Sequence, residues 1–283
     1  RRIQGFTPAD VTTFYDKMGE GFAKGSANLD QNLIGDFLGG SMAKATAGLA
    51  DFEMEGFVMD KVIEAQAKFA ESAFKYLGQV REKYVDMSED AFKTILGKAT
   101  GGIQQGGAET CGRKADCNVE KIQKMQQDVA KSFEIGLSNM SYTGFDSNKR
   151  QSYSTEVSRG LTRHVDRFVG KGGFQASHAG GAVAKIIDGA SDGINSSSSH
   201  WNTHHSTDLM DADALKAQLM DGVNQGREAW STGGGELSGV VSDADFLNDL
   251  ITKCQTSLSP EHSATCSTAF GSSSPGSSSP DEK

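Results

Sequence analysis

The chain contains no proline between Pro8 and Pro260, although it has 283 residues. Proline has no amide proton to donate in a helix and its ring clashes with the preceding turn, so one proline inside a helix costs about 3 kcal/mol. A proline-free stretch of this length is therefore typical of a mostly helical chain. The alternation of apolar and polar residues that marks strands is also missing from it.

Apolar residues recur at helical spacing along most of this stretch. We expect an all-α fold, an elongated multi-helix bundle of about seven to nine helices with Gly-rich connections and no substantial sheet. The segments "AFKYLG" and "AFKTILG" resemble each other, but shared amphipathic patterning explains their similarity. No repeat period typical of a solenoid is evident. The helices over 29–50 and 52–86 could run on as one bent rod. The predicted helices cover residues 7–22, 29–50, 52–86, 88–101, 119–140, 154–168, 183–194, 208–230 and 243–254.

Composition divides the chain into four regions. We expect a long-helix region over 1–100, a Gly-rich link over 101–118, a helical bundle over 119–254, and a Cys-pinned loop with a Ser/Pro-rich tail over 255–283. The tail "GSSSPGSSSPDEK" has no apolar side chains with which to build a core. It is expected to be a flexible end, or to become ordered only on a partner.

The net charge is −9, from 37 acidic and 28 basic residues. Binding to nucleic acid or to an anionic membrane needs a basic surface that releases counterions, so the composition argues against both partners. No window approaches the ~20 apolar residues of a membrane span, so no transmembrane span is expected.

The four cysteines fall into two local pairs. We expect Cys111 to bond Cys117 and Cys254 to bond Cys266, because each pair flanks a short polar segment; four free thiols in a reducing compartment remain the alternative. Disulfides persist outside the reducing cytosol, which predicts a secreted, cell-surface or organelle-lumen protein. The opening "RRIQGF" is not an intact signal peptide, so we expect a targeting segment before Arg1 to have been removed.

Glycine is unusually frequent for a helical chain, with 34 residues. Each glycine inside a helix costs about 0.5–1 kcal/mol relative to alanine. We expect close helix–helix packing to recover this free energy, although a flat ligand or looser, shorter helices would also accommodate it. The glycines within the predicted helical stretches include Gly35, Gly39, Gly48, Gly56, Gly136, Gly180, Gly222 and Gly226.

The segment "SSSSHWNTHHSTD" over residues 196–208 carries most of the candidate chemistry. Serine and asparagine compete with the backbone for hydrogen bonds, so we expect a polar loop rather than a helix. The residues nearest to a metal site are His200, His204, His205 and Asp208, but their spacing fits no known ligand pattern, so neither a metal nor a cofactor is expected.

One further histidine, His164, lies in the apolar series of the helix predicted over 154–168. It is either a haem ligand or, more simply, a boundary residue of that helix face.

Because the sequence contains no recognisable set of catalytic residues, we expect a non-catalytic structural or assembly subunit: a scaffold, linker or shell component. It would act through helix-mediated contacts with other protein subunits, in a homo- or hetero-oligomeric assembly. The first alternative is a helical carrier that binds a hydrophobic ligand or cofactor between helices, lined by some of the 15 phenylalanines. The second alternative is a membrane-active protein, and an enzyme using the segment from His200 to Asp213 ranks below both.

Overall fold

The structure is a computed structural model, and it describes residues 6–205, 207–233, 236–240, 243–258, 266, 267 and 270. The described residues form helices and no strand, which confirms the predicted all-α fold. None of the described helices is long and apolar enough to cross a membrane. The α-helices are α1 (Pro8–Ser26), α2 (Ile34–Gly48), α3 (Met59–Tyr76), α4 (Gly78–Lys83), α5 (Glu89–Arg113), α6 (Val119–Ser138), α7 (Ser147–Arg163), α8 (Ala179–His204), α9 (Ala212–Gly233) and α10 (Ala244–Ser257), with short 3-10 turns at Gln31–Leu33, Leu49–Asp51, His164–Phe168 and Ala176–His178.

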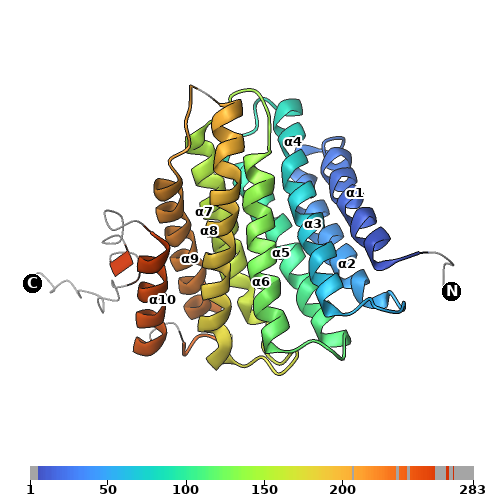
Figure 1. The fold of residues 1–283 in the computed structure, drawn as a ribbon. Coiled ribbons are helices and arrows are strands. Elements are labelled where there is room, and N and C mark those ends of the chain that lie inside the picture. The colour runs from blue at the N-terminus through green and yellow to red at the C-terminus, as the bar shows by residue number, and fades with distance from the viewer. Residues whose placement is uncertain are drawn as a thin grey trace, which may run out of the picture.

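The helices form two rows that run side by side across the molecule (Figure 1). α1, α3, α6, α8 and α10 follow one another in the first row, and α2, α5, α7 and α9 in the second. The chain alternates between the rows, so α1–α2, α3–α5, α6–α7 and α8–α9 are helical hairpins, each packed on the next. Buried apolar residues from Val11 to Phe270 form one continuous core between and within the rows.

Contacts between neighbouring hairpins recur at a nearly constant sequence separation. The Glu82 carboxylate accepts hydrogen bonds from the backbone N and Oγ1 of Thr143, both at 2.7 Å, and Asp208 accepts the same two bonds from Ser147, both at 2.6 Å. Both pairs are 61 residues apart, and bonds between other corresponding helices span 61 to 63 residues. The fold is therefore a stack of repeated hairpins with a period of about 60 residues, which the sequence did not reveal.

A short capping pattern marks each second-row helix or the 3-10 turn leading into it. Each capping residue follows an apolar residue. Its side-chain oxygen accepts a hydrogen bond from a backbone N–H of the first helical turn, which would otherwise have no partner within the helix. Asp or Asn stands two residues after the cap. The four capping residues are Asp30, Ser88, Asp146 and Asp211, roughly 60 residues apart.

Glycines bring the helices of one row into backbone contact. A Cβ added at Gly136 in α6 would lie 2.6 Å from the carbonyl oxygen of Glu71 in α3, and one at Gly226 in α9 would lie 2.5 Å from that of Arg159 in α7. Real Cβ atoms essentially never come within 3.0 Å of such atoms, so a larger residue would force the helices apart. These contacts confirm the expected close packing at these glycines. Gly56 differs, because it lies in a turn with a φ of 76°.

Several boundaries differ from those expected. Residues 101–113, predicted to begin a Gly-rich link, form the second half of α5, because its glycines face the neighbouring helices and pack there. Only residues 114–118 connect α5 to α6. The two helices expected over 29–50 and 52–86 do not run on as one rod, because residues 52–58 separate the end of the first from α3. The Ser/Pro-rich tail from 271 onwards lies outside the described residues.

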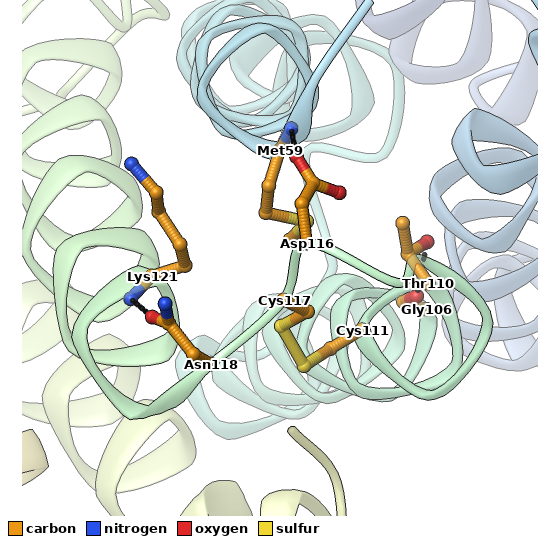
Figure 2. Close-up of a disulfide and its surroundings, with 8 residues drawn as sticks. All are labelled: Met59, Gly106, Thr110, Cys111, Asp116, Cys117, Asn118 and Lys121. Atoms are coloured by element: carbon orange, nitrogen blue, oxygen red, sulfur yellow. Dashed lines mark hydrogen bonds between the residues drawn. A yellow bond between two sulfur atoms is a disulfide. The ribbon is translucent and has the colours of Figure 1, made fainter. Parts of the chain in front are cut away.

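Both predicted cysteine pairs are at disulfide distance, with Cα–Cα separations of 5.3 Å for Cys111–Cys117 and 5.7 Å for Cys254–Cys266. Figure 2 shows the first pair closing the turn between α5 and α6. Within this turn, the Asp116 carboxylate accepts a hydrogen bond of 2.6 Å from the backbone N of Met59, the first residue of α3. α3 has no side-chain cap of its own, so the disulfide-closed turn between α5 and α6 caps it.

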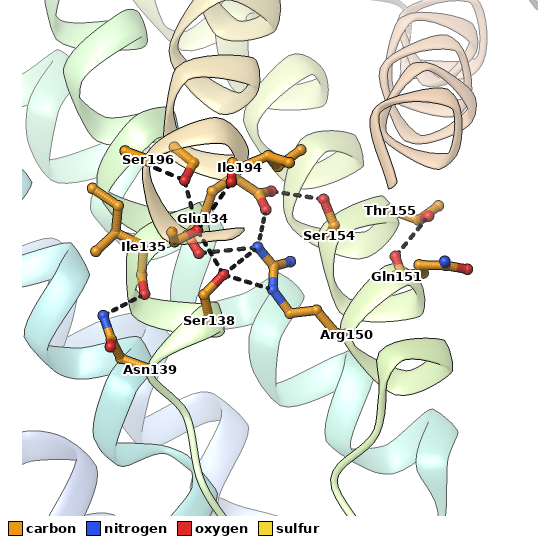
Figure 3. Close-up of polar contacts among 12 residues, drawn as sticks. Glu134, Ile135, Ser138, Asn139, Arg150, Gln151, Ser154, Thr155, Ile194 and Ser196 are labelled. Carbon is orange, nitrogen blue, oxygen red and sulfur yellow. Dashed lines mark hydrogen bonds and ion pairs between the residues drawn. The ribbon is translucent and has the colours of Figure 1, made fainter. Parts of the chain in front are cut away.

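A buried ion pair crosses the core where α6, α7 and α8 meet (Figure 3). Arg150 Nη2 lies 2.6 Å from Glu134 Oε2, and the side chains are 0% and 1% exposed. Ser154 Oγ donates to the other Glu134 oxygen at 2.7 Å, and Arg150 Nε donates to Ser138 Oγ at 3.2 Å. Both charges are thus held by several partners, which burial requires.

Arg150→Met is expected to lower the free energy of unfolding by about 3–5 kcal/mol, because it leaves the Glu134 carboxylate buried without its cation. The double variant Glu134→Leu/Arg150→Met should recover most of that loss, because it removes both charges together. Lys61→Met, which breaks an exposed pair with Glu64, serves as the control and should cost less than about 1 kcal/mol. Urea denaturation of the purified variants measures the free energy of unfolding of all three. Equal losses for Arg150→Met and Lys61→Met would contradict the conclusion that the buried pair needs both of its charges.

Gly226→Ala is expected to destabilise the chain by about 1–3 kcal/mol, because the new methyl group must push α9 away from the α7 backbone. The matched control is Gly112→Ala in α5, where a Cβ would meet only the flexible Lys171 side chain at 3.2 Å. That change should be neutral or stabilising, because alanine favours the helix over glycine. Thermal unfolding of both variants checks the difference in sign.

Candidate functional site

The segment 196–208, expected to be a loop, is helical as far as His204. The hydroxyls of Ser197 and Thr203 donate to backbone carbonyls one turn earlier, at 2.7 and 2.8 Å, so the helix itself satisfies them. Trp201 is fully buried and donates from Nε1 to the Asp208 carbonyl at 2.8 Å. The loop prediction was wrong because the apolar face that continues through Trp201 outweighed the weak helix propensity of serine.

The four metal candidates do not converge on one point. The rings of His200 and His204 are tilted against each other with centroids 4.0 Å apart, and His205 stacks on Trp201 at the same distance. Asp208 is occupied by its two hydrogen bonds from α7. Across the part of the chain that the structure describes, no three His, Cys, Asp or Glu side chains are grouped to hold a metal ion.

Charged side chains gather instead in a groove of about 670 Å³ on the second row of helices. It crosses α2, α5 and α7 and reaches the 3-10 turn His164–Phe168. Five cationic side chains and three carboxylates line it, so its local charge is opposite in sign to that of the whole chain. The charged lining residues are Lys44, Lys98, Arg159, Arg163, Arg167, Asp36, Glu109 and Glu156.

The groove exists because glycines occupy positions where other helices carry side chains. Gly97 and Gly101 of α5 form part of its lining, together with Gly160 of α7. A Cβ at Gly101 would lie 2.7 Å from His164 Nε2, and one at Gly160 would lie 3.0 Å from Thr100 Cγ2. The three helices therefore approach closely and leave a shallow channel above α5.

The charges of the groove are partly paired across helices. Lys98 of α5 contacts Asp36 of α2 at 2.6 Å, and Arg167 donates from Nη1 to Gln105 of α5 at 3.0 Å. Among the described residues, Arg163 and Lys44 form no ion pair within 4.0 Å. The groove thus keeps cationic groups available to an incoming anion.

Burial shifts two titrating groups at the α7 side of the groove. Burial raises the pKa of Glu156, and the adjacent Arg159, 2.6 Å away, partly opposes the shift. A Glu156 carboxyl that ionises less readily makes the groove more cationic as pH falls. Burial, reinforced by Arg167 and Arg163, lowers the pKa of His164 to about 4.

The protonation of His164 follows from its hydrogen bond. Arg167 Nε donates to His164 Nδ1 at 3.1 Å, so in the neutral ring Nε2 carries the proton and points toward Gly101. His164 thus lies in the lining of the groove, with its ring against Gly101 of α5.

Taken together, the groove offers guanidinium groups from α7 and the 3-10 turn that follows it, ammonium groups from α2 and α5, and a glycine lining that allows close approach. Such an arrangement suits an extended anionic chain, because arginine forks bind carboxylates bidentately. Sequence reasoning missed this site. Its signal was the spacing of Arg159, Arg163 and Arg167, which places three guanidinium groups on one face opposite the glycines of α5.

His164→Gln is expected to reduce the pH dependence of stability. The wild-type histidine binds a proton in the unfolded chain near pH 6.5 but in the folded chain only near pH 4, so stability is fully present above pH 6.5 and falls between 6.5 and 4. The loss from pH 8 to pH 5 should be on the order of 1–2 kcal/mol larger in wild type than in the variant. Urea titrations at both pH values measure it, and equal losses would show that His164 does not titrate as assigned.

Comparison with known proteins gives no precedent for this arrangement. No protein family matches the sequence, and neither the curated proteins nor the solved structures contain a match. The assignment of the groove therefore rests on its own geometry and charge.

Proposed function

We propose that this chain is a non-catalytic structural or assembly subunit that holds another protein in the groove on its second row of helices. The observation that carries the proposal is the groove itself: five cations over a glycine lining, in a chain with a net charge of −9. A partner segment rich in Asp and Glu fits this chemistry. Charges of this kind guide association and fix register, with affinity added by contacts that exclude water.

The repeated hairpins support a binding role. In stacked-repeat proteins each repeat contacts its neighbours, and the row of helices forms an extended surface on which partners bind. Here the close backbone approach of α2 to α5 at Gly39 and Gly102 keeps two walls of the groove in fixed positions. A rigid surface reduces the entropy that binding must overcome.

The two disulfides support an extracytosolic location for this subunit. Both pairs are formed between residues close in sequence, and the described residues contain no free cysteine. Bonds of this kind are maintained in secreted proteins and in organelle lumens. The proposed partner is therefore another protein in the same oxidising compartment.

A fluorescein-labelled deca-glutamate peptide tests the groove. Fluorescence anisotropy should show saturable binding that weakens as salt rises, because exposed charges are screened. Arg163→Glu should weaken it about tenfold, since it reverses the charge of a cation that has no ion-pair partner among the described residues. Lys61→Glu in α3, on the other row, is the matched control and should change binding little.

A deca-glutamine peptide should not bind at the same concentrations. If Arg163→Glu and Lys61→Glu weaken glutamate binding equally, the chain attracts acidic peptides without using the groove, and the proposal fails. Circular dichroism of both variants confirms that they remain folded.

A further inference from the structure

The last turns of α8 carry two histidines that the proposed function does not use. Because this segment is helical rather than a loop, His200 and His204 lie four residues apart on one face of the helix. Their ring centroids are 4.0 Å apart, with an angle of 32° between the ring planes. α8 ends at the edge of the molecule where the chain turns from the first row of helices to the second (Figure 1).

Both histidines of this pair are exposed to solvent. Neither ring forms a hydrogen bond to another helix in the part of the chain that the structure describes, and the bond that is present joins His204 to the backbone of its own helix. The adjacent His205 differs, because its ring stacks on the buried Trp201. Contacts with other helices therefore do not explain the pair.

The bond to the helix backbone determines which nitrogen of His204 can bind a ligand. His204 Nδ1 lies 2.9 Å from the carbonyl oxygen of His200. A carbonyl oxygen only accepts hydrogen bonds, so Nδ1 carries the proton of the neutral ring and Nε2 keeps its lone pair. Histidines that bind metal ions commonly donate their other N–H to a backbone carbonyl in this way, which holds the ring in position and raises its basicity.

The surroundings of the second ring also suit a metal ion. Partial desolvation lowers the pKa of His200, and the charges of His204, Lys75 and His205 lower it further, so the ring is uncharged at neutral pH. Metal ions bind the neutral form of imidazole. In addition, the carbonyl groups of the last turn of α8 carry the negative end of the helix dipole, which favours a cation there.

We propose that His200 and His204 bind one divalent late transition-metal ion, Zn²⁺, Ni²⁺ or Cu²⁺, through one nitrogen of each ring. Two histidines at i and i+4 of one helix are the paired ligands of helical zinc sites. Two nitrogens that each lie about 2.0–2.1 Å from a tetrahedral ion are about 3.3 Å apart, which rings with centroids 4.0 Å apart reach by a small rotation. Mg²⁺ and Ca²⁺ prefer oxygen ligands and do not suit this pair.

The site is an open one. Among the described residues, no third His, Cys, Asp or Glu is grouped with these two histidines to hold a metal ion. The remaining positions around the ion are left to water or to a ligand from another molecule. Structural zinc sites have four protein ligands, so binding here should be weaker, with a Kd on the order of 1–100 μM. The inference does not depend on an acidic partner in the groove.

Isothermal titration calorimetry with ZnCl₂ tests the site on the full chain, purified without a polyhistidine tag. The wild type should bind one equivalent of Zn²⁺ in this range of Kd, and MgCl₂ should not bind at the same concentrations. His200→Gln and His204→Gln should each raise the Kd at least about tenfold, because each removes one of two ligands. His205→Gln is the matched control: it removes the adjacent histidine, whose ring stacks on Trp201, and should leave the Kd unchanged.

Circular dichroism should show that all three variants remain folded, because neither ring of the pair bonds to another helix and His205 lies beyond the end of α8. A wild type that binds no Zn²⁺ at concentrations up to about 1 mM overturns the proposal. So does binding that His205→Gln weakens as much as His204→Gln, or that neither variant of the pair weakens, because the ion then lies elsewhere. His204→Gln should retain deca-glutamate binding and Arg163→Glu should retain Zn²⁺ binding, so a failure of either proposal is recognised separately.

Discussion

The close approach of helix backbones, made possible by glycine, is the constraint on which the rest of the structure depends. Where Gly136 meets α3 and Gly226 meets α7, no side chain separates the helices, so the distance between successive hairpins is fixed by backbone atoms. The free energy that glycine costs a helix is offset by tighter packing along each row. The same residues shape the surface, because the groove lies where the glycines of α5 leave space above the helix.

The helical character of the chain could be predicted from its sequence, and so could both cysteine pairings. The absence of proline and the spacing of apolar residues are local properties, and each disulfide joins residues close along the chain. The arrangement into stacked hairpins was not predictable in this way. Its sequence signal, a capping residue roughly every 60 positions at Asp30, Ser88, Asp146 and Asp211, is too sparse to stand out as a repeat.

The errors in helix boundaries have a common cause. Both 101–113 and 196–204 contain residues that favour turns in isolation, glycine in the first and serine in the second. In the fold, the glycines contact neighbouring helices and the serine hydroxyls bond to their own helix, so tertiary packing overrides local propensity. The groove was missed for the opposite reason: Arg159, Arg163 and Arg167 look like an ordinary solvated helix face until α5 is placed beside them.

The uneven distribution of cross-links along the stack has a consequence for how the molecule opens. The disulfides and the buried Glu134–Arg150 pair all lie beyond α4, whereas the first hairpin is held to its neighbour by packing, hydrogen bonds and exposed ion pairs such as Lys98–Asp36. In a stack governed by nearest-neighbour contacts, opening begins at the most weakly held end. The elements at the two ends, hairpin α1–α2 and helix α10, are therefore the segments whose amide protons exchange with solvent first, while α6, α7 and α8 retain theirs until the whole core unfolds.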